Sequence, residues 1–528
     1  MIDAQSHMSW QPAAGAEPNA EAEAELLGCE DLLDELAGLL RGAVQFDHFV
    51  QMHARIPSGG ATNCNDGNTG STRDGSGDTD DSSTVAGGIE GELRRSEGFT
   101  KLANAFIALS AQHSWASLAK TLRLYLAEER ASADAENAKE SKDREGKTRE
   151  GAWEAMLARS EMIDSSYYVF QRALRRAAHC CDAELAAAAL LHCSEVLSNL
   201  LIESLQTELR LSLSSKLAGA ALAGAQAIAK STEGSAAGIV AGVALDQALD
   251  CTAAARLPTS MLRALNALRL CAVCTPRLWQ EARHDMLAAV PAAAHMSLRE
   301  ALAHAQASEA VVQVALNTGL WQLADMVLPQ LKPKLERFTN ASYVLTNEEG
   351  LAAAEGSSFV VPLLLELDQV LGMLQPSLAP ANLDALVQVL IGALAEKIEA
   401  LLLNKQLDIY GAMQLNREVR ALLKRFAELT THSVRDKLAR LSQMATLINI
   451  EHEREVLEIW SQDGMQLSVT EAKAVMALRV DFRKENIAQA VAEAVAGIEV
   501  HTNDREGPAP PVRHAISILG CPSTLQKK

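Results

Sequence analysis

The sequence predicts an all-α protein, an elongated rod of stacked antiparallel helical bundles. Hydrophobic residues make up 48% of the 528 residues but aromatic residues only 4%, and the apolar content is mostly Ala and Leu, which favour helices over strands. Proline is absent from residues 58–257 and 381–507, whereas a strand-rich fold would be interrupted far more often. No repeat of fixed length recurs, which disfavours a repeat solenoid.

The first part of the chain alternates helical and polar segments. Residues 1–56 predict a mobile segment followed by one helix, whose apolar spacing lies at residues 33–50. Residues 57–92 contain mostly Gly, Ser, Thr, Asn and Asp, too few apolar side chains to offset the entropy of ordering, and predict a disordered low-complexity insertion. Residues 93–131 again have a helical pattern. Residues 132–152 have no apolar face and predict a charged linker.

The remaining chain is nearly continuous in its helical pattern. Residues 153–375 predict middle helical bundles and residues 376–498 a C-terminal helical bundle, followed by a Pro-containing disordered tail at 499–528. Thr275–Pro276 and residues 329–333 predict turns or kinks within the middle bundles, because proline interrupts the helical hydrogen bonds.

One helix of this region is especially clear. Its apolar residues recur on a single helical face between residues 383 and 402, and Asn382, which closely follows Pro380, is expected to be its N-cap. The residues of this face are Leu383, Leu386, Val387, Leu390, Ile391, Leu394, Ile398 and Leu401.

Charge and cysteine use restrict the cellular setting. The net charge of −19 argues against nucleic acid as the main partner, which would require a concentrated basic surface. Nine scattered cysteines suit a reducing cytosol, and the N-terminus has no signal-peptide pattern. No uninterrupted apolar run reaches about 18–20 residues; residues 217–229 and 236–245 come nearest, so any membrane association is expected to be peripheral.

Groups that resemble metal or redox sites have unsuitable settings. Cys271 and Cys274 form a C-x-x-C motif, but it lies inside a helical pattern without a second ligand pair and predicts ordinary buried cysteines. A second cluster spreads along one helix, where its members point in different directions, and predicts no metal site. This cluster consists of His179, Cys180, Cys181, His192 and Cys193.

Catalytic motifs are equally weak. His452–Glu453 begins like a zinc-protease motif, but Val456 occupies the position of the second histidine. No phosphate-binding glycine loop or nucleophile elbow occurs in a suitable context. The sequence therefore predicts no catalytic residue, no cofactor and no metal, and a protein that is not an enzyme.

The segment Ser468–Glu471 has the S-x-x-E form of a capping box, in which Ser468 caps a helix and Glu471 binds back to the Ser468 amide. A second interpretation is that Glu471 also forms a structural ion pair with Arg440 on a neighbouring helix, since Arg440 lies beside an apolar stripe. An exposed pair would contribute about 1 kcal/mol or less. If the pair is partly buried, loss of Arg440 would cost about 3 kcal/mol.

Several stretches resemble one known family, that of subunit 4 of the conserved oligomeric Golgi complex. The resemblance covers about residues 153–490 and is strongest after residue 410. In that family, Arg440 and Glu471 match positions that form a structural ion pair at the C-terminal end. The stretches that carry it are RDKLARLSQMATLINIE (435–451), EVLEIW (455–460) and ALRVDFR (477–483), with LNREVRALLKRFAELT (415–430) upstream.

The resemblance implies an all-α rod of the class found in multisubunit tethering complexes. It implies partners among sister subunits of the complex, SNAREs and Rab GTPases, peripheral association with the cytosolic face of the Golgi membrane, and a role in intra-Golgi retrograde transport. The family carries a substantial N-terminal helical region, so we expect this chain to begin inside the family's length. The alternatives are a subunit of a sister tether such as the exocyst, and a helical enzyme with an unrecognised site, which a deep pocket with convergent polar groups would support.

Overall fold

The structure, a computed structural model, describes residues 20–54, 96–139, 148–213, 258–345, 358–460 and 465–503, together with residues 347 and 356. The predicted insertion at 57–92, the apolar runs at 217–229 and 236–245, and the tail beyond residue 503 lie outside the described residues. Within the described part every regular element is a helix, and only isolated bridges pair Leu407 with Tyr343 and with Arg479. The all-α prediction is therefore confirmed.

The chain divides into two compact units. Unit 1 comprises Met1–Leu331 and Glu366–Val389, and unit 2 comprises Lys332–Leu365 and Leu390–Lys528. The boundary falls within helices, so α9, α11 and α12 each contribute residues to both units.

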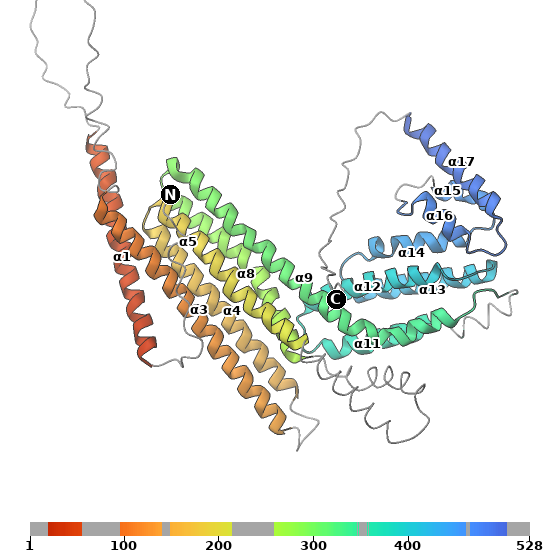
Figure 1. The fold of residues 1–528 in the computed structure, drawn as a ribbon, viewed down its shortest axis with the longest axis horizontal. Helices are drawn as coiled ribbons and strands as arrows, with labels where there is room; N and C mark the ends of the chain where they lie inside the picture. Colours follow the sequence, from red (N-terminus) through yellow and green to blue (C-terminus); the bar gives the residue numbers. More distant parts are fainter. Residues whose placement is uncertain are drawn as a thin grey trace, which may run out of the picture. The chain divides into compact units, whose positions relative to one another are not determined.

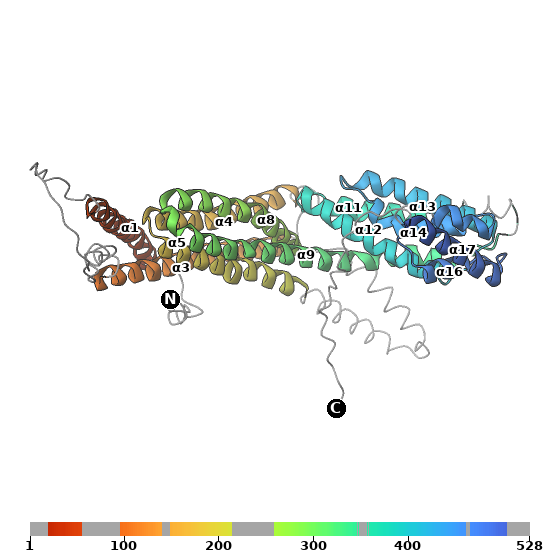
Figure 2. The ribbon, with the colours of Figure 1, turned by 90° about the horizontal axis from the view of Figure 1, so that it is seen from above.

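Unit 1 is a bundle of long helices (Figures 1 and 2). Helix α4 packs against α8 and also against α3, and α1 lies on α3 and α4. These helices are long because their apolar residues recur at helical spacing without a break, and the buried side chains are chiefly Leu and Ala. The helices are α1 (Ala20–Ala54), α3 (Glu97–Lys139), α4 (Thr148–His179), α5 (Ala183–Val196), α8 (Thr259–Ala289) and α9 (His295–Asn340).

Two positions at which the sequence predicts a turn or a kink lie inside continuous helices. Helix α8 continues through Thr275–Pro276, and α9 continues through Pro329 and Pro333, so a turn at either place is wrong. Proline removes one helical hydrogen bond at a cost of about 3 kcal/mol. In α8 the buried Thr275 hydroxyl lies 2.7 Å from the carbonyl of Cys271 and 2.6 Å from the Tyr167 hydroxyl of α4, and such packing outweighs the local cost of proline.

The expected N-cap of α12 (Pro380–Leu402) is also wrong. The helix begins at Pro380, because proline suits the first helical position, where its missing N–H is not needed. Asn382 is instead buried within the first turn and binds α8: its amide donates to the Leu265 carbonyl over 2.9 Å, and its carbonyl accepts from Arg269 Nε over 2.8 Å. The Asn382 side-chain amide is thus used in a buried contact with α8, although the local pattern predicts that it caps α12.

One helical stretch of unit 1, Ala183–Leu213, is long and apolar enough to cross a membrane by length and composition alone. It comprises α5, a π-helical turn (Leu197–Ile202) and the helix that follows. Of its most apolar window, 56% is buried inside the structure, as in the core helix of a helical bundle.

Unit 2 is a bundle of shorter helices, which begins with the end of α9 (Figure 1). Helix α14 packs against α13 and α16, and α17 packs against α15 and α16. The helices that lie wholly in unit 2 are α13 (Ile409–Leu429), α14 (Arg435–Ile448), α15 (Val456–Trp460), α16 (Val469–Met476) and α17 (Lys484–Asn503). The boundary between the two units crosses α11 (Val360–Leu374).

Candidate functional site

The structure brings together the two charges that the sequence singled out. Arg440 on α14 places Nη2 2.7 Å from Glu471 Oε1 on α16. Its Nη1 donates to the carbonyl of Gln466 over 3.3 Å, so the same side chain also contacts the loop that leads into α16. The guanidinium thereby joins α14 to the N-terminal end of α16.

Glu471 makes the capping interaction at the same time as the ion pair. The Ser468 hydroxyl accepts from the Glu471 amide over 3.3 Å, and Glu471 Oε2 accepts from the Ser468 amide over 2.8 Å. One carboxylate oxygen thus serves the cap and the other serves Arg440, so the two interpretations of Glu471 are compatible. The Arg440 guanidinium, followed by the Ser468 amide, lowers the pKa of Glu471 to about 2.

A third residue of this cluster was missed. Glu399 on α12 lies with Oε2 3.3 Å from Arg440 Nε, which makes Arg440 the centre of a three-residue network. The side chain of Glu399 is only 15% exposed, whereas those of Arg440 and Glu471 are 39% and 43% exposed. Burial raises the pKa of Glu399 although Arg440 opposes this shift. Its only sequence signal is its position beside Ile398 of the apolar face.

A second arginine is much more deeply buried. Arg479, within the ALRVDFR stretch, has no exposed side-chain surface, and its Nη1 donates to the carbonyls of Ile448 over 2.6 Å and Ile450 over 2.9 Å. Its other nitrogens bind the Asp481 carboxylate over 2.7 and 2.5 Å. Because these bonds join the end of α14 to the segment before α17, Arg479 is a structural residue that the sequence analysis did not identify.

A buried carboxylate and a close backbone approach join the end of α9 to α13. Glu418 accepts hydrogen bonds from the Tyr343 hydroxyl over 2.6 Å and from the Ser358 hydroxyl over 2.8 Å, and burial raises its pKa. Asp408 caps α13 by accepting from the Gly411 amide over 2.7 Å. A Cβ at Gly411 would lie 1.7 Å from the Tyr343 carbonyl oxygen, so this contact requires glycine.

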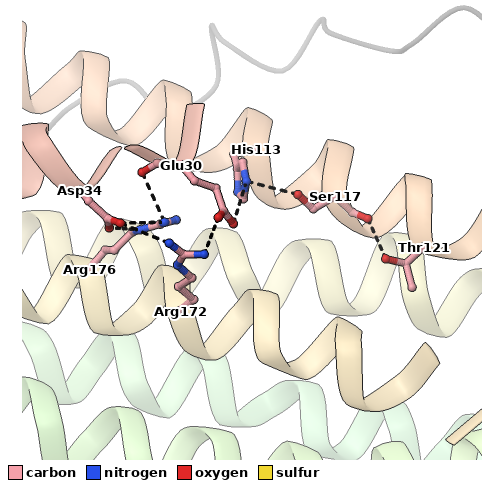
Figure 3. A network of polar contacts seen from close by, with 7 residues as sticks. All are labelled: Glu30, Asp34, His113, Ser117, Thr121, Arg172 and Arg176. Carbon is pink, nitrogen blue, oxygen red and sulfur yellow. Dashed lines mark hydrogen bonds and ion pairs between the residues drawn. The ribbon is translucent and has the colours of Figure 1, made fainter. Parts of the chain in front are cut away.

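A separate polar network in unit 1 joins α1, α3 and α4 (Figure 3). Arg172 on α4 pairs with Glu30 and Asp34 of α1, and Arg176 places Nε 2.6 Å from Asp34 Oδ1. His113 of α3 lies 3.4 Å from Glu30, and burial lowers its pKa although Glu30 opposes the shift. The hydrogen bond from Arg176 is the main reason that the pKa of Asp34 is lowered. These residues hold α1 onto the bundle.

The cysteine and histidine candidates lie in ordinary structural positions. Cys271 is buried in α8, and burial raises its pKa to about 12, which disfavours a thiolate. His192 Nε2 donates to the backbone carbonyl of Ala111 over 3.2 Å, and Cys193 is buried nearby on α5. Among the described residues, no three His, Cys, Asp or Glu side chains are placed to hold a metal ion. His452 precedes a short 3-10 turn, and Val456 is buried.

Comparison with known proteins finds a family match in the C-terminal half of the chain. Residues 262–474 match the family model of the conserved oligomeric Golgi complex subunit 4, C-terminal. Proteins named conserved oligomeric Golgi complex subunit 4 are similar in Arabidopsis thaliana (27% identity over 334 residues), Drosophila melanogaster (35% over 198) and Mus musculus (33% over 177). The resemblance carried by the sequence motifs is therefore confirmed for the C-terminal part of the chain.

These matches are partial on both sides. They cover 62%, 36% and 33% of this chain, and 41%, 25% and 22% of the respective relatives. The chain thus spans less than half the length of the relatives that it matches. A solved structure of the C-terminal domain of the exocyst subunit Sec6p is similar with a TM-score of 0.43 and 10% identity, covering 81% of this chain and 94% of that chain. A likeness this distant supports no inference about function.

Proposed function

We propose that this chain, whose residues 262–474 match the C-terminal family of conserved oligomeric Golgi complex subunit 4, acts as a non-catalytic subunit of a Golgi vesicle-tethering complex. The observation that carries the proposal is the similarity to proteins of that name in a plant, an insect and a mammal. A tether needs no reacting groups, which agrees with the structural positions of the cysteine and histidine candidates described above.

The mechanism is binding in place of catalysis. A subunit that holds a vesicle within reach of its target membrane raises the effective concentration of the fusion proteins, without forming or breaking a covalent bond. The partners in this proposal are the other subunits of the Golgi complex, SNAREs and Rab GTPases. The site of action is the cytosolic face of the Golgi membrane, reached by peripheral association, and the process is intra-Golgi retrograde transport.

Within this proposal, the cluster of Arg440, Glu471 and Glu399 is a structural joint of unit 2. It joins three helices, two of its side chains are more than a third exposed, and no reactive group lies among its partners. Ser468 supports the joint by capping α16. The role of the cluster is to keep the C-terminal bundle in one arrangement.

Affinity purification of the tagged full chain from cells of its own organism tests the proposal. We expect the other subunits of the conserved oligomeric Golgi complex to copurify, and exocyst subunits to be absent. Recovery of exocyst subunits instead would support the sister-tether alternative. A well-expressed, folded bait that recovers neither set would refute the proposal.

A chimera gives a second, independent test. Residues 262–474 would replace the matching region of the Drosophila relative in cells that lack that protein, with the intact relative as the positive control. Restored Golgi organisation is the expected result. Failure of a stable, correctly expressed chimera would contradict the functional equivalence of the matched region.

A further inference from the structure

A basic pocket lies between α1 and α4 in unit 1, and Asp34, Arg172 and Arg176 of the network in Figure 3 form part of its lining. Its volume is about 370 Å³, which falls within the usual range of small-ligand pockets, about 300–1,000 Å³. Four arginines and one histidine line it, with Asp34 as the one lining carboxylate, and Glu30, Glu281 and Asp285 pair with these arginines from outside the lining. The lining residues are Asp34, Ala37, Gly38, Arg41, Arg172, Arg175, Arg176 and His179.

The sequence spacing explains how so many basic residues meet. On α4 the basic residues lie at positions i, i+3, i+4 and i+7, from Arg172 to His179, so they share one helical face. On α1 the facing residues Ala37 and Gly38 are small and leave room for the guanidinium groups. Arg41 follows Asp34 by seven residues and therefore lies on the same face of α1, two turns further along.

The arginines differ in how fully their charges are balanced. Arg172 and Arg176 are held by Glu30 and Asp34, and Arg176 is only 6% exposed, so their positions are set before any ligand arrives. Arg175 lies 4.0 Å from Glu281 and 3.9 Å from Asp285, too far for good hydrogen bonds. Arg41 has no ion pair with any residue that the structure describes. The pocket thus combines two oriented arginines and Arg175, whose ion pairs are long, with Arg41, whose charge has no ion pair among the described residues.

We propose that this pocket binds a small anion that carries several phosphate groups. Guanidinium groups bind phosphate oxygens through paired, charge-assisted hydrogen bonds, and several of them in one pocket suit a multiply charged ligand. The limited volume favours a compact phosphorylated molecule or headgroup over an extended acidic peptide. The inference is independent of the proposed tethering function, because the pocket is lined by α1 and α4, which lie outside the residues 262–474 that match the family model.

Two kinds of variant of the full chain test the pocket. Arg41→Gln removes a charge that has no internal ion pair among the described residues, so the fold should be unaffected. Gly38→Leu leaves every charge in place and fills the pocket, since a Cβ at Gly38 meets no atom within 4 Å. Gly42→Leu is its matched control, because a Cβ at Gly42 is equally free and Gly42 does not line the pocket. Arg283→Gln on α8 is the matched control for lost charge.

The probe is inositol hexakisphosphate, titrated calorimetrically. We expect saturable binding to the wild-type chain, weakened about tenfold or more by Arg41→Gln and by Gly38→Leu, and unchanged in the two controls. Binding that is not saturable, or equal weakening in the pocket variants and their controls, would overturn the proposal. Circular dichroism and melting curves of all variants show whether a loss reflects the pocket or the fold.

A second arm identifies the source of the phosphate. Phosphatidylcholine vesicles with and without a phosphatidylinositol bisphosphate are sedimented with the wild-type chain and with Gly38→Leu. Sedimentation that depends on both the phosphorylated lipid and Gly38 assigns the pocket to a headgroup, whereas binding of the soluble probe alone assigns it to a free small molecule. If poly-glutamate binds more tightly than the probe, the pocket recognises acidic protein segments and the phosphate proposal is wrong.

Discussion

Replacing Arg479 with methionine should strongly destabilise the C-terminal bundle locally. Methionine keeps much of the apolar stem but removes the guanidinium, which has no exposed surface. Two buried backbone carbonyls, those of Ile448 and Ile450, would then lose the donor at 2.6 and 2.9 Å. Asp481 is 46% exposed and can be hydrated by water instead, so the loss of its ion pair with Arg479 contributes little.

The magnitude follows from the two carbonyls. A buried polar group that loses its partner costs about 1–3 kcal/mol, so two such groups give a loss of about 3 kcal/mol in local stability. This corresponds to an increase of about two orders of magnitude in the opening equilibrium of the surrounding helices. The stacking of Arg479 on the Phe482 ring, 4.3 Å from its centroid, adds to the loss.

Hydrogen exchange measured by mass spectrometry suits this prediction, because it resolves local stability in a protein of two units, where a single unfolding free energy is not well defined. We expect faster exchange in peptides from α14 to α17, while peptides from α3 and α4 provide an internal control. The matched variant is Arg483→Met, whose side chain is exposed and lies in the same stretch. Wild-type protection in Arg479→Met, or an equal effect of Arg483→Met, would refute the reasoning.

Three further predictions concern unit 2. Arg440→Trp leaves the largely buried Glu399 without its cation. Because Arg440 and Glu471 are both more than a third exposed, we expect a loss of about 1 kcal/mol in local stability. The loss should appear as faster hydrogen exchange in α14 and should be absent in the exposed control Arg435→Trp. Gly411→Ala would place a methyl group 1.7 Å from the Tyr343 carbonyl oxygen, so it should destabilise the start of α13 by about 3 kcal/mol or more. Gly372→Ala is the control and should be tolerated, because a Cβ there meets no atom within 4 Å. Equal melting temperatures for the two variants would contradict the close approach. The pKa of Glu471 is lowered in the folded protein from 4.5 to about 2, so its stabilising effect should be complete above about pH 5 and disappear as the pH falls toward 2. The melting-temperature difference between wild type and Glu471→Gln should shrink over that range, and a difference that stays constant would rule out this linkage.

Local features of the candidate site could be predicted from the sequence. The capping box at Ser468 involves a residue only three positions away, and the helical face from Leu383 to Leu401 follows from periodicity alone. Asn382 shows the limit of such reasoning, because the same residue that suits a cap also suits a buried contact with α8. Only the packing of α12 against α8 decides between these two uses.

Interactions between distant residues could not be predicted in the same way. Glu399 precedes Arg440 by 41 residues, and Glu30 precedes Arg172 by 142 residues, so no local pattern relates them. The basic pocket likewise requires α1 to lie on α4, although the four basic positions on α4 are visible in the sequence. Arg479 has no flanking pattern that distinguishes it from the exposed Arg483 nearby.

The sequence by itself determined the all-α class, the positions of most helices and the family resemblance of the C-terminal part, because apolar periodicity, capping and motif identity are encoded over a few neighbouring residues. The tertiary structure alone decided which charged side chains are buried, which helices Arg440 and Arg479 join, and where basic residues surround a pocket. The physical reason is that burial and ion pairing depend on helices distant in the chain, and their packing is a property of the whole bundle.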